Sequence, residues 1–210
     1  MNPPKQVQAV VDKEVIVEPA EAPKLRVRDR IFETACDLFY RHGIRAVGVD
    51  TIATEAGTNK MSFYRSFPSK DQLVAEYLLE QEREAWEWWD GTMAEHEGDP
   101  RAQVEALFDA HVKEMCEMDS RGCPMANAAV EITEDEHPAR AVVVEFKNEM
   151  RRRFHALARA LGARQYAILG DALMLLWEGS YMTRLTFQST NGPAQNAAKA
   201  AKVLIDVYTQ

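Results

Sequence analysis

Apolar residues recur at helical spacing along most of the chain. In the first such segment the stripe consists of Ile31, Phe32, Ala35, Leu38 and Phe39. This spacing predicts an amphipathic helix that stops at Gly43. A second stripe over residues 49–56 lasts barely two turns, and Gly57 then suits the left-handed residue that often ends a helix.

Polar residues mark the start of two further helices. Asn59 is a good N-cap for a third helix, and the stretch "FPSKD" ends that helix and begins a fourth with Ser69 as its cap. The second and third helices are joined by a turn at Gly57. This is the outline of a helix-turn-helix, in which the second helix of the pair enters the DNA major groove.

Side-chain positions on the third helix separate a core face from an outward face. At 100° per residue Phe63 and Phe67 point to the core, and the outward residues are Met61, Ser62, Tyr64 and Arg65. Hydroxyls, a cation and a thioether suit base edges, thymine methyls and phosphates. Lys70, in the first turn of the next helix, can reach a phosphate. Taken singly, each residue would also fit a solvated face, and Tyr64 a core position with a wet hydroxyl.

The remaining chain also has helical periods, so we expect an all-α fold. They cover about 70–95, 100–119, 123–133, 138–161, 164–189 and 193–209, separated by Gly and Pro clusters. Residues 1–23 lack a sustained period and predict a flexible N-terminal arm. We therefore divide the chain into this arm, a DNA-binding domain over 24–70 and an effector-binding and dimerisation domain over 71–210.

The last two helices predict a homodimer. The stretch "LGDALMLLWEGSYMTRLTF" is apolar around most of its circumference, so it must be covered on every side. A second subunit supplies that cover in a four-helix interface. The alternative is packing within one monomer.

Charge and composition limit the class of protein. The net charge is −8, but residues 24–75 hold 9 basic and 6 acidic side chains, a balance of +3. A basic module can bind phosphate despite a distant acidic body because salt screens the acidic charge over about 8–10 Å. The alternative is that a balance of +3 over so few residues is ordinary scatter.

There is no apolar run long enough for a membrane span and no signal peptide, and three cysteines fit a reducing compartment, so we expect a cytoplasmic protein without a membrane partner.

Residues 31–78 resemble the DNA-binding domain of the TetR family of bacterial transcriptional repressors. The resemblance rests on the stripe and Gly43, on "IA..AG" at 52–57 and on "Y..F.SK" at 64–70. It implies a homodimeric repressor released from a palindromic operator in double-stranded DNA by a small-molecule effector. It also implies that Tyr64 and Lys70 contact phosphates and that positions from Lys60 to Arg65 contact bases. Gly48 and Met61 depart from the family pattern, which usually has Thr and a small residue there.

Residues 121–140 supply candidates for the effector cavity. Their opening is similar to the pattern "GC..N...E" in one branch of TetR-like regulators, which implies that Cys123, Asn127 and Glu131 border the cavity. The alternative is a capping amide and a surface carboxylate. Cys123 stands near a helix start, which lowers a thiol pKa, so an electrophile or oxidant sensor with Cys116 as resolving partner is a second hypothesis. An inert buried thiol is the alternative.

Aromatic residues suggest a wall for the same cavity. Trp86 and Trp89 are three residues apart and could meet Trp177 and Tyr181, which would suit flat or cationic ligands. Such stripes also occur in ordinary cores.

The five histidines are scattered and no catalytic or nucleotide-binding motif occurs, so we expect no enzyme, no metal site and no cofactor. A helical small-molecule carrier without DNA binding remains the other alternative.

Overall fold

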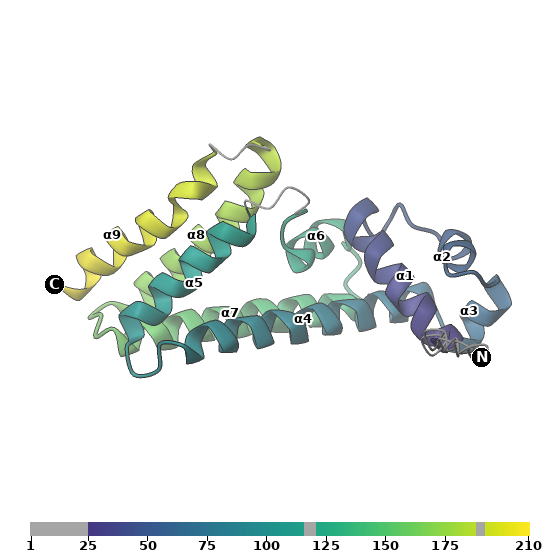
Figure 1. The fold of residues 1–210 in the computed structure, drawn as a ribbon, viewed down its shortest axis with the longest axis horizontal. Coiled ribbons are helices and arrows are strands. Elements are labelled where there is room, and N and C mark those ends of the chain that lie inside the picture. Colours follow the sequence, from purple (N-terminus) through teal and green to yellow (C-terminus); the bar gives the residue numbers. More distant parts are fainter. Residues whose placement is uncertain (1–24, 116–120, 188–191) are drawn as a thin grey trace, which may run out of the picture.

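The computed structural model describes residues 25–115, 121–187 and 192–210 of the chain (Figure 1). The predicted arm and Cys116 lie outside these residues. The described part is all-helical, as predicted, with α1 Val27–His42, α2 Val49–Glu55, α3 Lys60–Ser66, α4 Lys70–Ala94, α5 Pro100–Met115, α6 Pro124–Glu131, α7 Pro138–Ala160, α8 Tyr166–Phe187, a 3₁₀ turn Pro193–Asn196 and α9 Ala197–Thr209. None of these helices is long and apolar enough to cross a membrane.

Helices α1, α2 and α3 form a small bundle at one end of the molecule (Figure 1). The side chains of Phe63 and Phe67 are fully buried in its core, as predicted from their shared helix face. The side chain of Asn59 accepts a hydrogen bond from the backbone N–H of Ser62 at 3.0 Å, which confirms the cap of α3. Gly57 has a φ of 62° and makes the left-handed turn between α2 and α3. The start of α2 at Gly48 has no side-chain cap.

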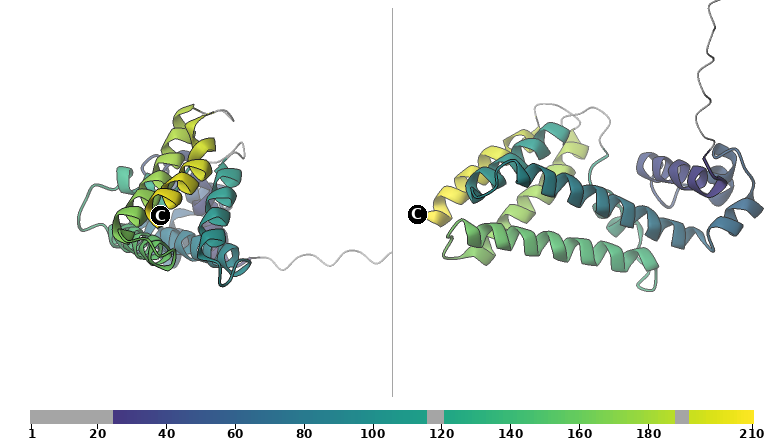
Figure 2. Two further views of the ribbon diagram at one scale, coloured as in Figure 1. Left: turned by 90° about the vertical axis from the view of Figure 1, so that its left-hand side faces the viewer. Right: turned by 60° about the horizontal axis from the view of Figure 1, so that its bottom comes forward.

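Helix α4 connects this bundle to the rest of the protein. It begins at the predicted cap, where the side chain of Ser69 accepts from the backbone N–H of Gln72 at 3.1 Å, and continues for 25 residues. Helix α7 runs beside it in the same direction, and in Figure 1 the long pair lies below α5, α8 and α9. The right view of Figure 2 shows α1, α2 and α3 at the end of the molecule opposite the C-terminus. The N-terminal turn of α4 therefore belongs to the small bundle, and its later turns belong to the body.

The body is held by close packing of α7 against α8. Gly170 on α8 lies so close to α7 that an added Cβ would be 2.5 Å from the ring Cδ2 of His155 and 3.0 Å from its backbone N and Cα. Glycine is therefore required here by the approach of two backbones. The ring of His155 also contacts Asp171 at 2.7 Å, and the guanidinium of Arg151 pairs with the same carboxylate.

We expect Gly170→Ala to lower the free energy of unfolding by about 1–3 kcal/mol because the new methyl group overpacks the α7–α8 contact. Gly91→Ala is the matched control: it lies within α4, and an added Cβ would meet nothing within 4 Å. Alanine should raise stability there by about 0.5–1 kcal/mol because it is the better helix former. Urea denaturation followed by circular dichroism measures both changes. Equal effects of the two substitutions would contradict the close-contact argument.

Candidate functional site

The outward face of α3 presents the side chains that the sequence predicted. Met61 is 73% exposed and Tyr64 is 50% exposed, whereas Phe63 between them is fully buried. The ring of Tyr64 packs edge-on against Phe63 with centroids 5.3 Å apart, so its position is fixed while its outer half stays open. Lys60 and Arg65 are exposed and Ser62 is half-buried. This arrangement offers a mixed polar and apolar surface; its contact with DNA stays a prediction.

Lys60 already has an acidic neighbour on α2. Its Nζ lies 3.2 Å from a carboxylate oxygen of Asp50, and both side chains are largely exposed. An exposed pair of this kind contributes little to stability because water and salt screen it. The pair therefore lowers the positive charge of the α2–α3 surface at little structural gain, and an approaching phosphate can compete for Lys60.

Lys70 is directed inward and not towards solvent. Its Nζ donates a hydrogen bond to the backbone carbonyl of Ile44 at 2.6 Å and lies 5.9 Å from the ring centre of Phe39. Burial lowers the pKa of Lys70, opposed by the negative charges of Asp71 and Glu131. Lys70 is partly buried because the chain that follows α1 folds back over the first turn of α4. The predicted phosphate contact therefore requires Lys70 to leave Ile44.

Glu131 lies at the junction of the two domains and not at the cavity border. Its carboxylate accepts from the backbone N–H of Arg45 at 2.8 Å, and the guanidinium of Arg45 pairs with Glu134 at 2.8 Å. Asn127 also lies away from the cavity lining, because its amide donates to the carbonyl of Arg121 at 3.0 Å. The two residues share a helix face as expected, but that face turns towards the end of α1. Neither residue lines the aromatic cavity described below, whereas Glu131 lines a second hollow with Ile44 and Lys70, so their ligand-binding role stays a prediction.

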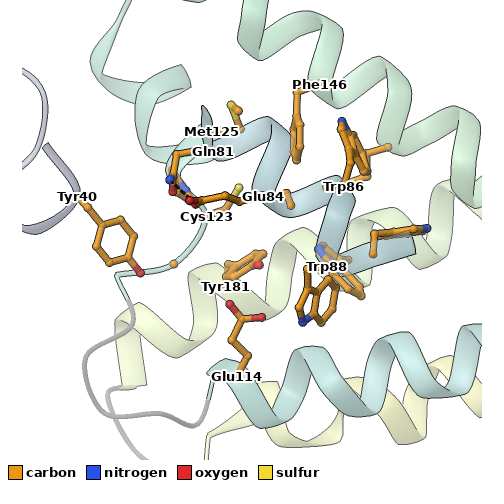
Figure 3. Close-up of a pocket in the computed structure, with 16 residues that line it drawn as sticks. Tyr40, Gln81, Glu84, Trp86, Trp88, Glu114, Cys123, Met125, Phe146 and Tyr181 are labelled. Atoms are coloured by element: carbon orange, nitrogen blue, oxygen red, sulfur yellow. Dashed lines mark hydrogen bonds between the residues drawn. The ribbon is translucent and has the colours of Figure 1, made fainter. Parts of the chain in front are cut away.

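A cavity of about 410 Å³ opens between α4, α5, α7 and α8 (Figure 3). Its aromatic lining consists of Trp86, Trp88, Trp89 and Trp177 with Phe146 and Tyr181. The predicted wall of Trp89, Trp177 and Tyr181 is thus brought together, and Cys123 lines the same space. The volume falls within the range of about 300–1,000 Å³ that is usual for small-molecule sites. Whether these residues bind a ligand stays a prediction.

The aromatic wall has a rigid backing. Trp89 and Trp177 are tilted against each other at 5.5 Å, and the ring of Trp177 stacks on His111 at 3.7 Å. His111 is fully buried, and its Nε2 lies 2.7 Å from the hydroxyl of Ser180. Burial lowers the pKa of His111 to about 3, so this ring is neutral near pH 7. The wall therefore has no positive charge behind it at this point.

Polar lining residues were missed by the sequence analysis. Glu84 on α4 and Glu114 on α5 both line the cavity, and Gln81 donates to the carboxylate of Glu84 at 2.9 Å (Figure 3). Tyr40 reaches the cavity from α1. Gln81, Glu84 and Trp88 are spaced three and four apart along α4, a one-face pattern that could have identified the first two. Nothing in the sequence placed Glu114 or Tyr40 next to α4.

The surroundings of Cys123 disfavour its thiolate form. It is only 6% exposed, and burial raises the pKa of its thiol despite Lys147, whose Nζ lies 3.7 Å from the sulfur. Lys147 itself pairs with Glu178 at 2.6 Å. The expected lowering of the pKa by the helix start is therefore wrong, because desolvation outweighs the backbone amides. The proposed partner Cys116 lies outside the described residues.

Side chains that could ligate a metal are dispersed over the described ranges. There, no group of three or more His, Cys, Asp or Glu side chains is placed to hold a metal ion. The two features with a shape suited to recognition are thus the α3 surface and the aromatic cavity.

Known proteins resemble this chain in the sequence of the small bundle and in the fold of the bundle and the body together. Residues 31–77 match the family model for bacterial regulatory proteins of the tetR family. The HTH-type transcriptional repressor SCO4008 of Streptomyces coelicolor is 45% identical over 49 residues, which cover 23% of this chain and 26% of that repressor. The sequence match thus spans about a quarter of the curated relative.

Solved structures extend the likeness to the whole fold. A TetR transcriptional regulator of Streptomyces avermitilis has 25% identity, covers 88% of this chain and 98% of its own, and gives a TM-score of 0.77. The TetR-family regulator SCO4454 of Streptomyces coelicolor is 23% identical, and the match covers 88% of this chain and 96% of that regulator with a TM-score of 0.79. At this identity the match shows a similar fold. Residues 31–77 thus match the TetR family of bacterial regulatory proteins in sequence, and the helical body has the fold of solved TetR-family regulators.

Proposed function

We propose that this protein is a dimeric repressor that leaves a palindromic operator when a small molecule enters the aromatic cavity. The continuity of α4 carries the proposal. Its first turn contacts the small bundle through Lys70, and its middle lines the cavity through Gln81, Trp88 and Trp89. In this proposal residues 24–70 bind DNA and residues 71–210 bind the effector and a second copy.

Two contacts between the domains support a mechanical route from cavity to DNA. Tyr40 of α1 lines the cavity, so a ligand would touch the DNA-binding domain directly. On the other side of α1, Glu131 holds the backbone of Arg45. A ligand that moves α4 relative to α6 changes how these contacts fit together. A preference of a few kcal/mol for one arrangement is enough to shift the equilibrium.

A second copy is expected on the α8–α9 face, which we define as Ile168, Leu175, Met182, Val203 and Val207. These side chains are 53–73% exposed although they are apolar. On α8 the spacing of seven between Ile168, Leu175 and Met182 is that of a helix-packing seam. Gly179 lies in the same stripe, and a Cβ added there would meet nothing within 4 Å, so no contact within the protomer requires a glycine. A partner helix packed closely against α8 would require a glycine at this position.

Selection of bound duplexes from a random pool tests the DNA-binding function. We expect a palindrome whose half-sites are spaced by whole helical turns of about 10–10.5 base pairs, and affinity that falls steeply with salt. Arg65→Ala should relax the preference at particular bases, whereas Tyr64→Ala should weaken all duplexes alike. Absence of any DNA retention at low salt, also after refolding to remove bound ligand, would refute the repressor and favour a small-molecule carrier.

Asp50→Asn should strengthen binding to a mixed-sequence duplex. The change releases Lys60 from its pair and removes a negative charge near the DNA surface. The slope of log affinity against log salt should steepen by up to about 0.9. Fluorescence anisotropy with a labelled duplex measures it. Glu95→Gln, at the far end of α4, is the control for net charge alone. An equal gain in both variants would place Lys60 away from phosphate.

Leu175→Glu should separate the dimer into protomers. A charge at this position would be buried without a partner in the proposed interface. Sedimentation velocity should then give a mass near the 23.8 kDa of one chain and not twice that value. Leu79→Glu is the control, because Leu79 on α4 is also exposed and apolar but lies outside the α8–α9 face. A dimer that survives Leu175→Glu but not Leu79→Glu would place the interface elsewhere.

A further inference from the structure

We propose that the aromatic cavity selects a flat aromatic cation, such as an N-alkylated or protonated ring system. The inference rests on the proposed function, since it names the chemical class of the effector in the same cavity. It follows from three features of the lining: the aromatic rings, the sign of the charged groups, and the neutralisation of the nearest cations.

The aromatic rings reach the cavity from several directions. Trp88 and Trp89 project from α4, Phe146 from α7, and Trp177 and Tyr181 from α8. Aromatic faces carry negative charge density and attract cations within about 6 Å of the ring centre. The protein already uses this attraction beside the cavity, where the guanidinium carbon of Arg153 lies 4.2 Å from the ring centre of Trp86.

The charged side chains of the lining are all acidic. Among the described residues that line the cavity, Glu84 and Glu114 carry charge, and both are carboxylates. They come from different helices, α4 and α5, and in the view of Figure 3 the ring of Tyr181 stands between them. A cation in the cavity would therefore meet carboxylates from two different helices. Gln81, which donates to Glu84, holds that carboxylate in place.

Three basic groups close to the cavity are already paired with carboxylates or are neutral. Lys147 lies behind Cys123, and its ammonium group is paired with Glu178 at 2.6 Å. His111 behind Trp177 is neutral because it is buried. The guanidinium of Arg153 is paired with Asp90 and Glu149. An anionic ligand would thus meet carboxylates and no cation among the described lining residues, whereas a neutral ligand would make no use of their charge.

The tryptophans provide a direct assay. The chain contains four tryptophans, and all four line this cavity. Intrinsic tryptophan fluorescence of the full-length protein therefore reports on the cavity. We would titrate three probes of similar shape: 1-methylquinolinium as the cation, 1-naphthalenemethanol as the neutral compound and 1-naphthoate as the anion. We expect the cation to bind at least about tenfold more tightly than the neutral compound and the anion to bind most weakly.

Charge-removing variants assign the preference to particular groups. The double variant Glu84→Gln with Glu114→Gln should lose most of the preference for the cation and keep the affinity for the neutral compound. Glu87→Gln is the matched control, because Glu87 is an exposed carboxylate one turn further along α4 that does not line the cavity. It should leave the preference unchanged. Equal loss in control and double variant would show a general charge effect and overturn the assignment.

The outcomes separate this inference from the proposed function. If the neutral compound or the anion binds as tightly as the cation, the cation inference fails, while effector binding in the cavity survives. If no probe quenches the tryptophans at millimolar concentration, the inference fails as well. Operator binding, measured separately with the selected duplex, decides whether the repressor itself stands.

Discussion

The uninterrupted course of α4 is the constraint on which the other parts of the structure depend. Nineteen residues along this helix separate Lys70 from Trp89, which at 1.5 Å per residue is about 28 Å. Leu73, Val74 and Leu78 are fully buried near the small bundle, and Trp89 is buried in the body. Because both ends are anchored in packed cores, α4 cannot move at the cavity without stressing its contacts with the small bundle. The aromatic cavity and the small bundle that carries α3 are thereby coupled through one rigid element.

The local features of the fold follow from short-range rules. Asn59 and Ser69 cap the helices that they precede, Gly57 makes the left-handed turn, and Phe63 and Phe67 fall into the core because their spacing puts them on one face. Each of these outcomes depends on neighbours within a few residues. For this reason the helix-turn-helix and most helix boundaries of the body could be predicted from the sequence.

The candidate site could be predicted only in part, because its remaining members meet across long sequence separations. Trp86 and Trp89 were found since they share α4, but Glu114 and Tyr40 reach the cavity from α5 and α1. A helix period gives the face on which Glu131 lies but does not identify its neighbour across the domain junction, the backbone of Arg45. The pKa of the Cys123 thiol is raised and not lowered because burial, a property of the folded whole, outweighs the local field of the helix start.

The uneven charge of the chain is consistent with a division of tasks between the domains. Residues 76–210 hold 14 basic and 23 acidic side chains, and residues 24–75 have the opposite balance. An acidic body would repel DNA phosphates if its charge acted at full strength, but salt confines most of this repulsion to about 8–10 Å. Over that same short range the acidic body raises the local concentration of a cation near the cavity. One charge pattern can therefore favour phosphate at α3 and a positively charged ligand at α4 without conflict between the two.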